Sequence, residues 1–276
     1  MQFDQYLNQA REGGAQQIAA SWGQGRTTFG GLSAAITLES ISSIEAKAEN
    51  GGKRLLRSLN VNFCGPLMVE QPFELEHQLL SEGKSISQRT GQAIQNGRVV
   101  TQVVACYGAS RDSDIAVQAE RISLIEQGVV GPGQGTKLGY IAGVTAEFVQ
   151  HIDFSLIKGG FPFSDCQETV MEGWMRFSSA PDEFHDSHLA ALIDSWPPVV
   201  MQMMKRPGPA SSVSWNLELM QPLPKIEPEE WLFYQAVIKQ AANGYAHTDS
   251  RVYKADGTLL ALSRQLVTIY DKKQIK

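Results

Sequence analysis

The chain has 276 residues, of which 42% are hydrophobic and 19% are charged, so it can bury a substantial core and is not compositionally disordered. Its net charge at pH 7 is −5, without a sustained lysine and arginine stripe, which argues against a nucleic-acid surface. No apolar run approaches the roughly 18 residues that span a bilayer, and the N-terminal segment lacks the apolar core of a signal peptide. We therefore expect a cytoplasmic protein that binds neither nucleic acid nor membrane.

Cysteine and histidine spacing argues against a bound metal. The three cysteines, Cys64, Cys106 and Cys166, are odd in number, far apart and without CxxC spacing, which excludes a disulfide framework and a structural zinc site. Each lies in apolar or strand-like sequence, so we expect it to be buried. The five histidines show no HExxH pattern, and His185 with His188 is typical of a solvated pair near a helix start. We expect no metal and no cofactor.

The first half predicts a helix followed by four strands. Phe29-Gly30-Gly31 opens the helix. The segment that follows, LSAAITLESISSIEAKA (32–48), carries Leu32, Ile36 and Ile41 at helical spacing. Alternating runs rich in Val, Leu, Thr and aromatic residues then predict antiparallel strands. The predicted strands are 58–64, 72–81, 85–95 and 98–109.

Residues 113–143 predict a linker. This stretch contains GVVGPGQGTKLGY, whose glycines and proline favour an irregular surface segment. The glycines do not form a phosphate loop, because no GK[ST] follows them and no βαβ context surrounds them. Residues 144–180 then carry an opening strand or two, FVQHIDFSLI and ETVMEGWMRF.

The second half repeats the order of one helix and then strands. HLAALIDSWPPVVMQMM (188–204) predicts the helix, and Pro197 and Pro198 do not suit a helix interior. We therefore expect a helix boundary near Asp194–Trp196, where Asp194 can equally serve as a helix N-cap. The predicted strands are 212–220, 231–241, 245–255 and 258–270.

Two matched pairs of segments indicate a duplicated unit. SLNVNFCGPL (58–67) matches SWNLELMQPL (214–223), with Ser, Asn and Pro-Leu in the same places. QNGRVVTQVVACYG (95–108) matches ADGTLLALSRQLVTIYD (255–271), each with a glycine turn before a long strand. The separations, 156 and 160 residues, are similar, and the order is the same in both halves.

One central helix and an antiparallel meander, given twice, predict an α+β double hotdog, in which each sheet wraps around its helix. The predicted units are residues 1–112 and 144–276, and the second carries the active site. Joining two units in one chain covers the open sheet edge that each would have alone. A plain α+β sandwich is the alternative, and the repeat disfavours it.

Three polar residues interrupt apolar patterns in the second unit. They are Asp194 in LAALIDSWPPVV, Asn216 in VSWNLEL and Gln265 in LLALSRQLVTIY. A buried amide or carboxylate without partners costs on the order of 1–3 kcal/mol, so three such residues at one point could satisfy each other and hold a water. A serine hydrolase finds no support, because Ser33 lies in GGLSAA and no GxSxG elbow is present.

Five segments carry a family resemblance: Phe29–Gly31, Leu192–Pro198, Ser214–Glu218, Asn243–His247 and Gly257–Gln265. In these the chain resembles the TesB-like, type II acyl-CoA thioesterase family over nearly its whole length. The resemblance implies a double hotdog that activates a water with an Asp, a Ser or Thr, and a Gln. Asp194 and Gln265 fall on the Asp and Gln positions. Asn216 falls on the hydroxyl position, which is a departure, and Ser214 on the same strand face is an alternative.

The resemblance also implies the partners. The substrate is an acyl-CoA, with Gly31, Trp196 and Tyr245 as substrate-binding residues, and hotdog proteins of this kind pair as homodimers. Asp194 would be the general base, with Gln265 and Asn216 fixing the water. The helix start at Asp194–Pro198, or another loop, would supply the N–H donors for the oxyanion.

Other expectations and rivals accompany this hypothesis. CoA phosphates could meet the basic clusters Lys205-Arg206 or Lys53-Arg54-Arg57. The first unit should be silent, because Ala105 matches Gln265 and Gly30 or Gly31 matches Asp194. A non-catalytic acyl-CoA or hydrophobic-ligand binder with a degenerate site is the main alternative, with Asn216 as its mark. A hotdog dehydratase would need a catalytic His with an acidic partner, and the sequence shows no such pair.

Overall fold

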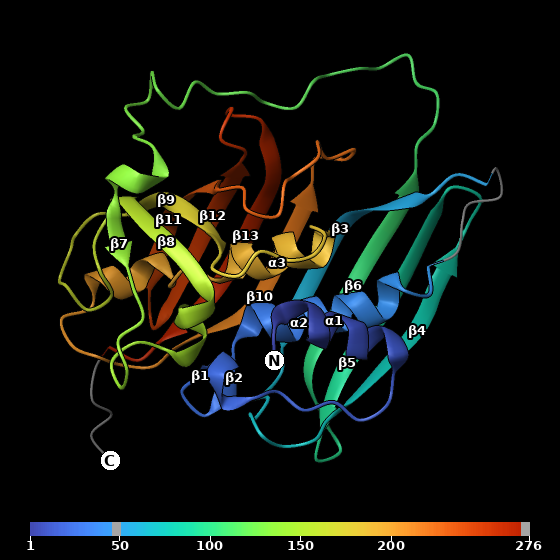
Figure 1. Ribbon diagram of the computed structural model, residues 1–276, viewed down its shortest axis with the longest axis horizontal. Coiled ribbons are helices and arrows are strands. Elements are labelled where there is room, and N and C mark those ends of the chain that lie inside the picture. The colour runs from blue at the N-terminus through green and yellow to red at the C-terminus, as the bar shows by residue number, and fades with distance from the viewer. Residues whose placement is uncertain (46–50, 272–276) are drawn as a thin grey trace.

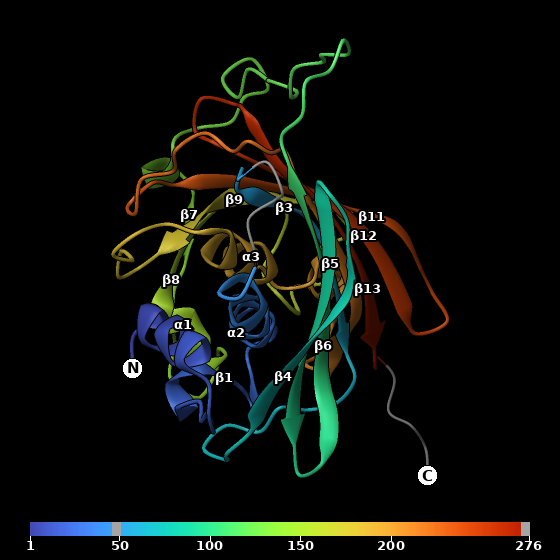
Figure 2. The same cartoon turned by 90° about the vertical axis from the view of Figure 1, so that its right-hand side faces the viewer.

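Eleven antiparallel strands form one curved sheet, and two central helices lie against its inner face (Figures 1 and 2). The computed structural model describes residues 1–45 and 51–271. The strand order across the sheet is β4-β5-β6-β3-β10-β13-β12-β11-β9-β8-β7. The strands are β3 (Arg54–Phe63), β4 (Glu74–Glu82), β5 (Ile86–Gln95), β6 (Arg98–Ala109), β7 (Thr136–Leu138), β8 (Ile152–Lys158), β9 (Val170–Phe177), β10 (Ala210–Leu219), β11 (Leu232–Ala242), β12 (Tyr245–Tyr253) and β13 (Leu259–Ile269).

The sheet consists of two repeated halves that meet in its middle. Strands β3 to β6 belong to the first unit and β8 to β13 to the second, and the halves join where β3 pairs with β10. In this ladder Asn60 lies opposite Asn216, so matching positions of the repeat face each other. Each unit adds one central helix, α2 (Gly30–Ser42) or α3 (Asp186–Asp194). This arrangement confirms the predicted α+β double hotdog, and the β3–β10 pairing removes an exposed edge from each half.

Helix α2 is buried on every side. All residues from Gly31 to Ile41 are buried, including the charged Glu39, which pairs with Arg11 and accepts a hydrogen bond from Ser187. A Cβ atom on Gly31 would lie 2.8 Å from the carbonyl oxygen of Ala191 in α3. A glycine is therefore required for α2 and α3 to approach this closely, and the approach brings the first turn of α2 to the end of α3.

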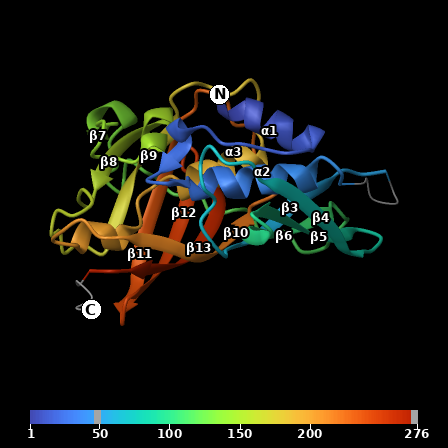
Figure 3. The same cartoon turned by 90° about the horizontal axis from the view of Figure 1, so that it is seen from below.

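A further helix, α1 (Phe3–Glu12), packs against α2 and α3 and is not among the predicted elements (Figure 3). Its apolar face is buried, and its Asp4 reaches α3, where Asp4 Oδ1 lies 2.6 Å from His188 Nε2. The side chain of His188 is 1% exposed. The prediction of a solvated His185–His188 pair is therefore wrong for His188, because α1 covers this turn of α3.

The predicted strands lie within a few residues of the observed ones, whereas the helix ends differ more. The first predicted helix ends at Ser42, and its residues 46–48 lie outside the described residues. The second ends at Asp194, which confirms a boundary there. The N-cap interpretation of Asp194 is wrong, because this residue is the last in α3. A short 3-10 helix (Val199–Met203) follows the two prolines.

The structure also bears on the predicted linker and on the predicted burial of the cysteines. The predicted linker 113–143 contains β7, which pairs with β8 and extends the sheet of the second unit. Cys64 is exposed and Cys106 and Cys166 are only half-buried, so the prediction that each cysteine is buried is wrong. Within residues 1–45 and 51–271, no helix is long and apolar enough to cross a membrane.

Candidate active site

Asp194 places its carboxylate at the junction of the two units. Gln265 of β13 donates a hydrogen bond from Nε2 to Asp194 Oδ1 at 2.5 Å. The backbone N–H of Gly31, in the first turn of α2, also donates to this carboxylate. First-turn N–H groups have no acceptor inside their own helix, so the contact satisfies one of them. The structure thus brings together three predicted site residues, Asp194, Gln265 and Gly31.

Burial dominates the electrostatics of Asp194. Removal from water disfavours the charged form and raises the pKa of this carboxyl from 3.8 to about 7, although the hydrogen bonds from Gln265 and Gly31 act to lower it. A carboxyl with this pKa is present in both protonation states near neutral pH. This is the property that a general base operating at neutral pH requires.

Gly30 leaves the space that the carboxylate occupies. A Cβ atom on Gly30 would lie 2.8 Å from Asp194 Oδ2 and 3.2 Å from the ring of Phe63. A larger residue would therefore displace the carboxylate from the first turn of α2. The two glycines have separate roles, since Gly31 allows the helices to approach and Gly30 accommodates Asp194.

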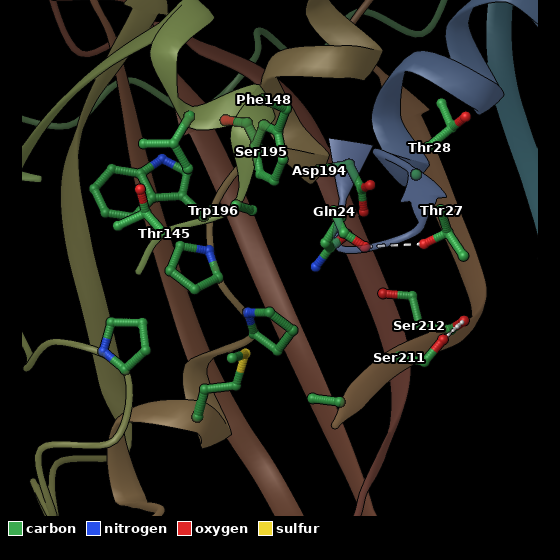
Figure 4. Close-up of a pocket in the computed structure, with 18 of the residues that line it drawn as sticks. Gln24, Thr27, Thr28, Thr145, Phe148, Asp194, Ser195, Trp196, Ser211 and Ser212 are labelled. Carbon is green, nitrogen blue, oxygen red and sulfur yellow. Dashed lines mark hydrogen bonds between the residues drawn. The ribbon is translucent and has the colours of Figure 1, made fainter. Parts of the chain in front are cut away.

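A cavity of about 880 Å³ opens beside Asp194 and is lined by both units (Figure 4). Its volume falls within the roughly 300–1,000 Å³ of small-molecule sites. The apolar lining includes Phe148, Phe154, Phe161, Phe163, Trp196, Pro197, Pro198 and Met201. The polar lining includes Gln24, Thr27, Ser211, Ser212 and Gln265. Phe148 and Trp196 lie across the cavity from Thr27, Ser211 and Ser212 (Figure 4), so the cavity suits a ligand with one apolar and one polar end.

Ser212 is a hydroxyl residue of this cavity that the sequence analysis missed. It lies opposite Val267 on the neighbouring strand, and a β-bulge follows before Ser214 pairs with Leu266. Val267 is buried and lies two residues from Gln265, so Ser212 shares the inner face with Gln265. The bulge inserts one residue and changes which side chains face inward, a common device beside active sites.

Asn216 lies on the opposite face of the same strand. Its Nδ2 donates to Asn60 Oδ1 at 2.9 Å in an exposed position, while its neighbours Trp215 and Leu217 are buried in the core. Ser214, two residues earlier after the bulge, shares the face of Asn216. The prediction that Asn216 belongs to the site is therefore wrong, because strand alternation directs its side chain away from Asp194.

Of the two other residues predicted to bind substrate, Trp196 lines the cavity and Tyr245 does not. Trp196 lines the cavity, where its ring stacks on Tyr234 with centroids 5.5 Å apart. Its indole N–H points to the sulfur of Met175 at 3.2 Å, which fixes the ring. Tyr245 begins β12, is 48% exposed and is not among the residues that line the cavity. The prediction that Tyr245 binds substrate is therefore wrong for this cavity.

In the predicted basic cluster Lys53-Arg54-Arg57, both arginines make contacts that stabilise the fold. Arg54 is buried and forms ion pairs with Glu45 and Glu82. Arg57 donates to the carbonyl oxygens of Gly108 and Gln221. In the other cluster, Lys205 is exposed and lies 3.2 Å from Asp165.

The repeat relates the cavity to a smaller cleft of about 400 Å³ at the start of α3. Cavity residues Thr27, Thr28, Gly30, Ser33 and Leu67 match, 156 positions later, cleft residues Glu183, Phe184, Asp186, Leu189 and Leu223. At the same offset the counterpart of Asp194 in the first unit is Leu38. The expectation that Gly30 or Gly31 is this counterpart is therefore wrong. The cleft thus has no carboxylate at the position of Asp194 and, with Ala105 matching Gln265, no amide partner.

Comparison with known proteins gives consistent results. The family model for the C-terminal domain of acyl-CoA thioesterases matches residues 129–269, and that for the N-terminal domain matches 18–108. A conserved hot dog protein of unknown function from Alicyclobacillus acidocaldarius is 25% identical with a TM-score of 0.78, covering 96% of this chain and 98% of that one. A putative thioesterase II from Thermobifida fusca YX is 17% identical with a TM-score of 0.73, covering 97% of each chain.

The tesB protein of Mycobacterium avium subs paratuberculosis is 16% identical with a TM-score of 0.70, covering 97% of this chain and 99% of that one. No curated protein matches the chain. Two hotdog units in one chain, each matched by a thioesterase domain model, define a double-hotdog thioester hydrolase. The chain belongs to the acyl-CoA thioesterase family, of which both domain models match in order. The predicted resemblance is confirmed, whereas the homodimer stays a prediction.

Proposed function

We propose that this protein hydrolyses an acyl-CoA to a free acid and CoA, with Asp194 as the general base. The observation that carries the proposal is the Asp194–Gln265 pair beside a cavity with an apolar wall. Thioester hydrolysis requires a nucleophilic water, and a carboxyl with a pKa of about 7 can take the proton of that water at neutral pH. The acyl group would lie against Phe148, Phe154 and Trp196, shielded from solvent.

The chemistry proceeds in two steps. The water oxygen attacks the thioester carbonyl carbon while Asp194 accepts a proton from the water. The resulting oxyanion is stabilised by first-turn N–H groups of α2 that lack helical acceptors, and by the positive end of the helix dipole. The tetrahedral intermediate then collapses, the C–S bond breaks, and Asp194 returns the proton to the departing CoA sulfur. In this mechanism the first unit supplies the donors, because the segment Asp194–Pro198 ends a helix.

Gln265 and Ser212 would position the water. Both face the cavity from adjacent strands, Gln265 from β13 and Ser212 from β10. An amide and a hydroxyl can each donate and accept, so together with Asp194 they can fix the water at the attack distance. Ser212 then takes the hydroxyl role that Asn216 was predicted to fill. The alternative, a ligand binder with a degenerate site, was based on Asn216 in place of a hydroxyl residue. With Ser212 in the hydroxyl role, Asn216 no longer supports that alternative.

The test compares Asp194→Asn with the wild-type protein on acyl-CoAs of graded chain length, with CoA release measured by a thiol-reactive dye. A general base contributes about 10²–10⁴-fold to the rate, so we expect a loss of kcat in that range. Asn216→Ala is the matched control, and its rate should stay close to wild type because Asn216 faces outward. An unchanged rate in Asp194→Asn, or no hydrolysis of any acyl-CoA by the wild-type protein, refutes the proposal.

A further inference from the structure

A small hairpin of the first unit borders the candidate site of the second. Strands β1 (Gly23–Gln24) and β2 (Thr27–Thr28) pair with each other immediately before α2. Thr27 Oγ1 donates to the backbone oxygen of Gln24 at 3.1 Å, which closes the turn (Figure 4). On the outer side the hairpin is fixed by a bridge from Thr27 to Met68. The hairpin therefore presents its side chains to the cavity in a defined shape.

The segment that leads into the hairpin is anchored on the second unit. The carbonyl oxygen of Ser21 lies 3.1 Å from His151 Nε2 and accepts a hydrogen bond from Gln150 Nε2 at 3.4 Å. The ring of Trp22 stacks on that of His151, with centroids 4.0 Å apart and an interplanar angle of 10°. These contacts set the position of the hairpin relative to Asp194, although the two lie in different units.

The hairpin carries an amide beside the cavity and a cation in its turn. Thr27 and Thr28 lie next to the first turn of α2, where Gly30 meets Asp194. The carboxamide of Gln24 lines the cavity and has no hydrogen-bond partner within the described part of the chain. Arg26 lies at the exposed turn beyond the cavity, and no described residue pairs with its guanidinium. In the hairpin ladder Gln24 lies opposite Thr27, and Arg26 lies in the turn beyond this pair.

Coenzyme A presents groups that complement this amide and this cation. The two amides of its pantetheine arm follow the thioester, and its phosphates come after them. A free carboxamide can pair with an amide of the arm through both its donor and its acceptor atoms. A guanidinium matches the geometry of phosphate oxygens and can contact two of them at once.

Building on the proposed function, we infer that the β1–β2 hairpin is the CoA-binding element, with Gln24 on the pantetheine arm and Arg26 on the phosphates. Of the other bases considered, Arg54 and Arg57 are engaged in the fold and Lys205 pairs with Asp165. Lys53 interacts with the carboxylate of Asp186 at the other cleft. Arg206 and Lys137, which lines the cavity, are the competitors for the phosphates. The acyl group then points the other way, toward Phe148 and Trp196.

The test uses three thioesters that share one acyl group: the acyl-CoA, the acyl-pantetheine and the acyl ethyl thioester. Gln24→Ala should raise KM about three- to tenfold for the first two and leave the ethyl thioester unchanged, because only the ethyl thioester lacks the amides. Arg26→Ala should raise KM by a similar factor for the acyl-CoA alone, and added salt should weaken its effect. In each case kcat should stay near wild type. Arg98→Ala, at the exposed start of β6, is the control for loss of one charge.

Two results overturn the inference. One is an unchanged KM for acyl-CoA in both hairpin variants, and the other is a rise in KM for acyl-CoA that appears in Arg206→Ala and not in Arg26→Ala. Calorimetric binding of CoA itself separates this inference from the proposed function. If the wild-type protein binds CoA and both hairpin variants weaken that binding, while no acyl-CoA is hydrolysed, then the proposed function fails and the binding element stands. If hydrolysis occurs but neither hairpin variant affects KM or CoA binding, only the inference fails.

Discussion

Replacement of Asp194 by asparagine should stabilise the folded protein at alkaline pH while it removes activity. The pKa of the carboxyl is about 7 in the folded protein and 3.8 in the reference state. The folded state therefore holds this proton more strongly than the unfolded state does. As pH rises from about 4 through 7, ionisation of Asp194 costs the wild-type protein stability. Asparagine resembles the protonated carboxyl in shape and does not ionise, so the variant avoids this loss.

The magnitude follows from the shift. About three pKa units, at about 1.36 kcal/mol each, correspond to about 4 kcal/mol. The carboxylate borders an open cavity, and screening by water there reduces the expected gain to about 2 kcal/mol at pH 8. For a chain of this length, that gain corresponds to an increase in Tm of about 4–8 °C. At pH 4, where Asp194 is protonated in the folded protein, the two proteins should melt within about 1 °C of each other.

The assay is thermal unfolding of both proteins by calorimetry at pH 4, 6 and 8. Asp114→Asn, at an exposed position, provides a control that also removes one negative charge. The reasoning is refuted if Asp194→Asn is less stable than wild type at pH 8. It is equally refuted if the difference in Tm does not change with pH, or if Asp114→Asn shows the same pH-dependent gain.

Three further predictions concern activity. For the wild-type protein, kcat/KM should fall about tenfold per pH unit below about pH 7 and level off above it, since the ionised Asp194 is the active form; a stopped-assay pH profile checks this. Gly30→Ala should lower kcat about tenfold or more, because its Cβ would lie 2.8 Å from Asp194 Oδ2; circular dichroism should show an intact fold. Ser212→Ala should lower kcat about tenfold, whereas Ser212→Thr should retain most of it, and a wild-type rate in Ser212→Ala would remove this residue from the mechanism.

Much of the fold could be predicted because strand pattern and repeat are both local sequence signals. Alternating apolar runs placed β3, β5, β6 and β10 to β13 within a few residues, since one face of each strand is buried in the core. Helix α1 was missed although Phe3, Tyr6, Leu7 and Ala10 have the spacing of an amphipathic helix, because its segment lies outside the matched segments of the repeat on which the prediction was built. The hairpin β1–β2 also escaped, because two-residue strands leave no periodic pattern.

The sequence identified only those residues of the candidate site whose orientation does not depend on the register of a strand. Asp194 ends a helix and Gln265 lies in a regular strand, so their surroundings in the sequence marked both. Ser212 and Asn216 lie on β10, where one inserted residue decides which side chains face inward. A β-bulge leaves no reliable mark in a single sequence, so the inward position of Ser212 could not be predicted. Asn216 was chosen because it falls on the hydroxyl position of the family that the chain resembles, although alternation with the buried Trp215 and Leu217 places it on the outer face. The Gly31 donor was equally hidden, because it depends on the approach of two helices from different units.

The repeat also gives a reason why we propose chemistry in the cavity beside Asp194 and not in the cleft at the start of α3. Asp186 stands where the active cavity has Gly30, and burial raises the pKa of its carboxyl to about 6. A side chain at this position fills the space that a carboxylate from α2 would need, so the cleft cannot form the same pair. Asp186→Asn should therefore leave kcat and KM for acyl-CoA within about twofold of wild type, where Asp194→Asn loses activity. A loss in Asp186→Asn comparable to that in Asp194→Asn would mean that both junctions take part in hydrolysis.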